Sequence, residues 1–70
     1  EYPKAVEYLE RAVEITGDDP TIIEHLGDAY DKAGRPDRAL IRYRAALKLT
    51  KETDQNKRLR DKIQRLEKKT

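Results

Sequence analysis

The chain has 70 residues, of which 43% are charged, and it contains no Cys, Phe, Trp or Met. A chain this short builds one small core worth roughly 3–5 kcal/mol, and the composition leaves that core to Ala, Leu, Ile, Val and Tyr. Disulfides and thiolate metal sites are excluded, and no apolar run is long enough to span a membrane.

The termini and the charge distribution bear on origin and partners rather than on the fold. The absence of Cys fits reducing and oxidising compartments equally, so localisation stays unknown. The first residues lack the regions of a signal peptide and the chain begins without Met, so we expect a fragment of a larger protein. Residues 1–19 carry two basic and six acidic groups, a net −4, whereas residues 51–70 carry eight basic and four acidic groups, a net +4.

The first half of the chain predicts two helices separated by a short turn. Residues 2–16 have the apolar spacing of a helix, and Gly17 can take the left-handed conformation that ends one. Asp19 can cap the next helix, and Pro20 suits its first turn because the missing N–H has no helical partner there. We place this second helix at residues 20–33.

The second half predicts two more helices. Gly34 ends the second helix, and Pro36 opens a third that runs over residues 36–49. A fourth helix covers residues 54–68, with Thr53 or Asp54 as its cap. The apolar residues of that helix form a single stripe: Leu59, Ile63 and Leu66. A helix with one apolar side can close a stack of helices but cannot continue it.

An internal comparison shows a repeat. A shift of about 34 residues places Ala5 over Ala39 and Ala12 over Ala46, with large apolar neighbours between them. Small residues at recurring positions permit the close approach of helix axes, to about 8–10 Å. Residues 2–16 therefore look like the second helix of a hairpin whose first helix is missing.

The central hairpin carries a known signature. The pattern Trp, Leu-Gly, Tyr, Ala and Phe, with its fixed spacings, is met in register by Ile23, Leu26, Gly27, Tyr30, Ala39 and Tyr43. Two positions depart in kind: Ile23 stands where Trp is usual, and Lys51 stands where Pro is usual. On these residues the sequence resembles a tetratricopeptide repeat.

The resemblance implies an all-α fold of about four helices, in which antiparallel hairpins stack as a right-handed α-solenoid. Residues 20–49 would be one complete repeat, residues 2–16 the second helix of a preceding repeat, and residues 54–68 a capping helix. In this family Gly27 would let the two helices of the hairpin approach. The implied function is a scaffold or adaptor segment that binds a protein or peptide through the concave face of the array, without catalysis and without a cofactor.

The candidate groove residues come from two helices. Five residues of the second helix point away from its apolar side, and three cations of the last helix join them: Thr21, Glu24, Asp28, Asp31, Lys32, Arg58, Lys62 and Arg65. The spacing of the three carboxylates makes this face acidic. The family's carboxylate clamp uses Lys and Asn where Glu24 and Asp28 stand, so we expect no acidic peptide tail here and favour a basic peptide.

Two other readings of this acidic face stay open. It can be a solvated charged surface, or it can pair within the chain. The last helix carries Arg58, Lys62 and Arg65, and each follows a carboxylate of the second helix by one 34-residue period. Helices that lie side by side in register would bring the two triplets together, and we predict at least partial pairing.

Nucleic acid is the alternative partner, because the last helix holds a run of basic residues: Lys57, Arg58, Arg60, Lys62, Arg65, Lys68 and Lys69. Asp61 and Glu67 interrupt the run, and no aromatic residue on this helix could stack on a base. We therefore regard nucleic acid as the weaker reading.

Metal binding, catalysis and self-association are the remaining classes. His25 is the single histidine and lacks converging ligands, and no nucleophile-elbow, phosphate-loop or zinc-protease motif occurs, so we expect no metal and no enzymatic activity. Without a preceding helix, residues 2–16 should expose part of an apolar strip: Tyr2, Val6, Leu9 and Val13. We expect either fraying of this helix or self-association through it.

Overall fold

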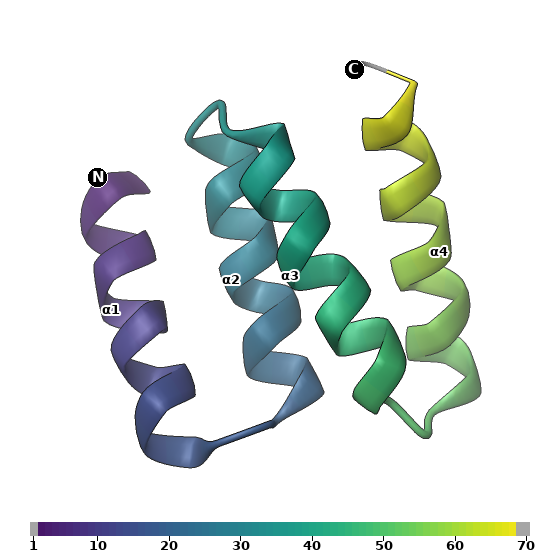
Figure 1. The fold of residues 1–70 in the computed structure, drawn as a ribbon, viewed down its shortest axis with the longest axis horizontal. Helices are drawn as coiled ribbons and strands as arrows, with labels where there is room; N and C mark the ends of the chain where they lie inside the picture. The colour runs from purple at the N-terminus through teal and green to yellow at the C-terminus, as the bar shows by residue number, and fades with distance from the viewer. Residues whose placement is uncertain (1, 69–70) are drawn as a thin grey trace.

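The computed structural model describes residues 2–68, apart from the side chain of Tyr2. Four helices span this range: α1 (Tyr2–Thr16), α2 (Pro20–Lys32), α3 (Pro36–Leu49) and α4 (Thr53–Glu67). Each helix runs antiparallel to the one before it, so the start of α1 and the α2–α3 turn lie at the same end of the molecule (Figure 1). Within the described residues no strand occurs, which confirms the all-helical fold expected from the sequence.

Local sequence signals set the helix boundaries in the first half of the chain. Gly17 has a φ of 77° and Gly34 a φ of 79°, both in the left-handed region that ends a helix. The Asp19 carboxylate accepts the backbone N–H of Thr21 at 2.8 Å, as a capping residue does. Pro20 is the first residue of α2, and α2 ends at Lys32, one residue earlier than expected.

The start of α4 differs from the sequence-based expectation. The capping position belongs to Glu52, whose side chain makes no capping hydrogen bond, so neither Thr53 nor Asp54 is the cap. The Thr50 hydroxyl accepts the Glu52 N–H at 3.1 Å and donates to Gln55 Oε1 at 2.6 Å. This side-chain link ties the connecting segment to the first turn of α4, and the helix covers 53–67 rather than 54–68.

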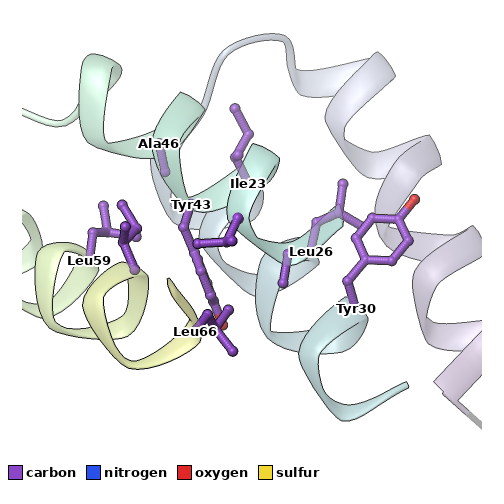
Figure 2. Close-up of a cluster of buried hydrophobic side chains, with 10 residues drawn as sticks. Ile23, Leu26, Tyr30, Tyr43, Ala46, Leu59 and Leu66 are labelled. Carbon is purple, nitrogen blue, oxygen red and sulfur yellow. The ribbon is translucent and has the colours of Figure 1, made fainter. Parts of the chain in front are cut away.

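The core lies mainly between α2 and α3 (Figure 2). Leu26, Ala39, Tyr43 and Ala46 are fully buried there. A Cβ atom on Gly27 would lie 2.6 Å from Cε1 of Tyr43, so the glycine leaves the space that the tyrosine ring fills. This confirms that close helix approach explains a glycine in mid-helix, and it identifies the group that needs the space.

The two outer helices attach to this hairpin differently. From α4 a single buried stripe faces the core: Leu59, Ile63 and Leu66. From α1 the side chains of Val6, Leu9 and Val13 are only partly buried against the core. The large apolar side chains most exposed on α1 are Tyr8 at 73% and Ile15 at 82%, which the sequence reading missed. The expectation for Tyr2 lies outside the described side chains.

Candidate functional site

The facing sides of α2 and α4 are joined by polar side chains at one regular interval. Four pairs link residues that are 34 positions apart: Thr21 with Gln55, Glu24 with Arg58, Asp28 with Lys62, and Asp31 with Arg65. We call these eight residues the ion-pair ladder. Each of these contacts therefore joins α2 to α4 at the same interval that relates the small residues of the internal sequence comparison.

Glu24 is the centre of the ladder, with a side chain that is only 3% exposed. Its carboxylate accepts a two-point hydrogen bond from Arg58, with Nε at 2.7 Å and Nη2 at 2.8 Å. Lys62 Nζ at 2.8 Å and Gln55 Nε2 at 3.0 Å complete the set of donors. A bidentate Arg–carboxylate contact is among the stronger polar contacts in proteins and fixes orientation as well as distance.

These donors act on the charge state of Glu24. The Arg58 guanidinium, helped by Gln55 and Lys62, lowers the pKa of Glu24 from its ordinary 4.5 to about 2, although burial by itself would raise it. The same contact raises the pKa of Arg58. Glu24 therefore stays ionised at neutral pH in a place where an unpaired carboxylate would be costly.

The outer pairs of the ladder are more accessible. Lys62 Nζ lies 2.9 Å from Asp28 Oδ1, and Arg65 Nη2 lies 3.0 Å from Asp31 Oδ2. The side chains of Arg58 and Arg65 are 51% and 50% exposed, so about half of each stays accessible to solvent. The exposed chemistry of the ladder is therefore largely cationic at its α4 side.

The ladder is also tied to the core through Tyr43. The Tyr43 hydroxyl donates to the Asp28 carboxylate, and Lys62 Nζ lies 5.4 Å from the centroid of the Tyr43 ring, within the range of a cation–π contact. Burial of Tyr43, together with this bond to Asp28, raises the pKa of its hydroxyl far above the ordinary value. The same ring thus fills the space beside Gly27 and supports the charged surface.

The structure separates the sequence-predicted site residues into two groups. The predicted pairing of Glu24, Asp28 and Asp31 with Arg58, Lys62 and Arg65 is confirmed. The reading of this face as a solvated charged surface is wrong for Glu24, because the cations of α4 cover it. Lys32 makes no contact in the ladder and lies at the edge of α2 that faces α1, beside Ala5.

Several polar contacts were missed from the sequence, and two of them involve buried groups at or near the site. Gln55 is buried at 5% exposure, and its signal was its place one period after Thr21. The second is a network across α1, α2 and α3, in which Glu10 accepts from the Tyr30 hydroxyl and from Arg42 Nη2 at 2.9 Å. The 34-residue period did not predict the contacts of Glu10, because Tyr30 and Arg42 lie 20 and 32 residues from it in the sequence.

The remaining sequence candidates can now be placed. A shallow groove runs along α4 and mixes both charge signs: Asp54, Lys57, Arg58, Asp61, Lys62 and Arg65 line it. Three cations of the basic run already contact carboxylates of α2, and Lys69 lies outside the described residues.

His25 is exposed. In the described part of the chain no group of three or more metal-ligating side chains gathers, and no helix there could cross a membrane.

Comparison with known proteins gives one match. A family model described as a tetratricopeptide repeat matches residues 22–58, which is just over half of the chain and runs from α2 through α3 into α4. The matched range contains all of α3, nearly all of α2 and one complete pair of the ladder, Glu24 with Arg58. Neither the curated proteins nor the solved structures yield a match.

Proposed function

This chain belongs to the tetratricopeptide repeat family, whose repeats generally mediate protein–protein interaction, and we propose that it binds a protein or peptide through the face shared by α2 and α4. The observation that carries this proposal is the register of the ladder. Pairs at one 34-residue interval make α2 and α4 two neighbouring strips of a single surface. A surface built from equivalent positions in successive layers is the kind that repeat proteins use for binding.

The same register supports our assignment of the repeats. We infer that α2 and α3 form one complete repeat, that α1 is the second helix of a preceding repeat, and that α4 caps the stack. In support, α1 contacts α3 through Glu10 and Arg42, as α2 contacts α4 through the ladder. The residues of α4 at the positions of Ile23, Leu26 and Tyr30 are polar, so α4 offers little apolar surface to a further helix.

The chemistry of the face favours a different partner from the one expected from sequence. A basic peptide would have to displace Arg58 and Lys62 from Glu24, which is buried beneath them. We propose instead that the partner meets the exposed parts of the Arg58 and Arg65 side chains, with Thr21 at the margin of the surface. An acidic or polar segment fits these parts without breaking the ladder.

Peptide display followed by NMR mapping tests the proposal. A peptide selected from a random library for binding this chain is titrated into the isotope-labelled protein, and we expect amide shifts along α2 and α4. Arg65→Ser should weaken that peptide by about tenfold, because a charge-assisted contact is lost. Arg11→Ser on the exposed side of α1 is the matched control and should bind as the parent does. Shifts confined to α1 or to the outer side of α3 contradict the proposal.

Two further expectations follow from this reading. Catalysis is not expected, in keeping with the family. The nucleic-acid alternative is weakened, because Arg58, Lys62 and Arg65 already contact carboxylates. Titration with single-stranded and duplex DNA at low and high salt checks it: tight, strongly salt-dependent binding would favour nucleic acid over a peptide.

Self-association through α1 also stays a prediction, now centred on Tyr8 and Ile15. Sedimentation across a range of protein concentrations tests it. A monomer at every concentration would contradict it.

A further inference from the structure

The start of α1 and the α2–α3 turn lie at one end of the molecule, at the top of Figure 1. Residues from this end line a second recess. We call it the end pocket. It has a volume of about 540 Å³, within the range of about 300–1,000 Å³ that is typical of small-ligand sites. It lies away from the ladder, and its lining shares no residue with the ladder.

The end pocket has an apolar part and a cationic part. Pro3 and Val6 from α1, with Ala33 and the Tyr30 ring, supply the apolar part. Lys32, Arg35 and Arg38 supply three cations, and none of the lining residues that the structure describes carries a carboxylate. In the ladder, by contrast, Arg58, Lys62 and Arg65 are each paired with a carboxylate of α2.

Two acidic residues of the helices that form the end pocket, Glu10 and Asp37, are not part of its lining. Glu10 accepts from the Tyr30 hydroxyl and from Arg42, so its charge is already matched. Arg38 lies beside the same hydroxyl. Glu10 raises the pKa of Tyr30, and Arg38 acts against that increase. Asp37 belongs to the first turn of α3 and is exposed, but it is not part of the lining.

The start of α3 adds to the positive character of the recess. Arg35 occupies the capping position of α3 and makes no side-chain capping bond. The first turn of a helix carries N–H groups without helical partners and a partial positive charge. This feature is secondary here: the three cations around an apolar recess are the main observation.

We propose that the end pocket binds an acidic segment of a protein partner, in which a Glu or Asp side chain lies next to an apolar residue. The carboxylate would meet the forked donors of Arg35 and Arg38, and the apolar side chain would pack on Val6 and Ala33. Guanidinium groups suit carboxylates because their donors match the two oxygens. This inference rests on the proposed function, since it supplies a second contact and a chemical class for the partner.

A nucleic-acid backbone fits the same recess less well. Its phosphates carry charge but bring no aliphatic group to Pro3 and Val6, and the Tyr30 ring is 6% exposed, so it offers no open face for a base to stack on. Inorganic phosphate serves as the test of this alternative.

Peptide titration of the isotope-labelled chain tests the proposal. The probe is acetyl-Glu-Leu-Glu-Leu-amide, and two matched peptides replace either both Glu by Gln or both Leu by Ser. We expect the parent peptide to shift the amides of residues 4–6 and of the non-proline residues within 33–38 at lower peptide concentration than those at 58–65, because, of these two surfaces, only the end pocket offers an apolar contact beside its cations. Each matched peptide should bind at least about fivefold more weakly, because each loses one of the two kinds of contact.

Variants separate this site from the rest of the surface. R35Q combined with R38Q should weaken the Glu-Leu peptide by at least about tenfold. R60Q removes an exposed arginine of α4 and should leave the affinity unchanged, and circular dichroism of each variant should match the parent. Equal binding of the Gln peptide, or competition by inorganic phosphate as strong as by the peptide, overturns the proposal. Binding of a display-selected peptide along α2 and α4 would survive that failure, so the two proposals can fail separately.

Discussion

Helix α2 meets α3 and α4 through two contacts of opposite character. Towards α3 it is apolar and closely fitted, with Gly27 making room for the fully buried Tyr43. Towards α4 the contact includes the polar ladder, whose pairs are separated by a fixed interval of 34 residues. Apolar burial is non-directional, whereas paired charges depend on position. The difference indicates that burial supplies most of the stability and that the ladder sets how α4 is aligned with α2.

The largest expected effect tests whether burial or charge holds α4 in place. Leu59→Ala removes a fully buried side chain and should cost about 2–5 kcal/mol, close to the whole stability of so small a domain. Thermal or urea denaturation followed by circular dichroism measures the loss. Ile41→Ala, at a position that is 62% exposed, is the control and should change stability by less than about 0.5 kcal/mol. Equal losses would show that α4 is not packed as described.

The second-largest expected effect is a loss of stability in acid, caused by protonation of the ladder. Because the folded state lowers the pKa of Glu24 from 4.5 to about 2, the paired carboxylate contributes stability that is fully present above pH 4.5. That contribution, roughly 3 kcal/mol, is lost as the pH falls from about 4.5 to about 2. Urea denaturation over this pH range measures it. Glu24→Gln should flatten the slope, and an unchanged slope in that variant would mean that another group is responsible.

The close contact between α2 and α3 should respond to a single methyl group. Gly27→Ala places its Cβ 2.6 Å from the Tyr43 ring, and such overpacking costs about 1–3 kcal/mol. The gain of about 0.8–1 kcal/mol in helix propensity offsets part of this cost. We expect net destabilisation in the parent chain. In a Tyr43→Leu background the same substitution should become neutral or stabilising, and destabilisation of equal size in both backgrounds would argue against the clash.

Much of the fold could be predicted because its signals are local. Gly17, Asp19, Pro20 and Gly34 set helix ends through their own backbone preferences, and the structure places them as expected. The cap of α4 was misplaced for the opposite reason. Its capping position, Glu52, makes no side-chain capping bond, and the side-chain contact at this end comes from Thr50 in the preceding connection, whose hydroxyl donates to Gln55.

The candidate site could be predicted only in part. The 34-residue interval was enough to anticipate the pairing of α2 with α4, because equivalent positions in stacked repeats lie side by side. The burial of Glu24 was not visible, since a charged residue is normally exposed and only the converging donors make its burial tolerable. The end pocket was also missed, because it forms where the ends of three helices meet.

The smallest expected effect tests the alignment of α2 and α4 most directly. In a double-mutant cycle, Asp28→Ala and Lys62→Ala should couple by up to about 1 kcal/mol, since these side chains are only partly buried. Pairing Lys62→Ala with Asp37→Ala, which lies on another helix and makes no contact with Lys62 in the ladder, is the control and should be additive. We predict measurable coupling between Asp28 and Lys62 and none between Asp37 and Lys62. Additivity in both cycles would contradict the proposed stacking of α2 and α4 in consecutive layers.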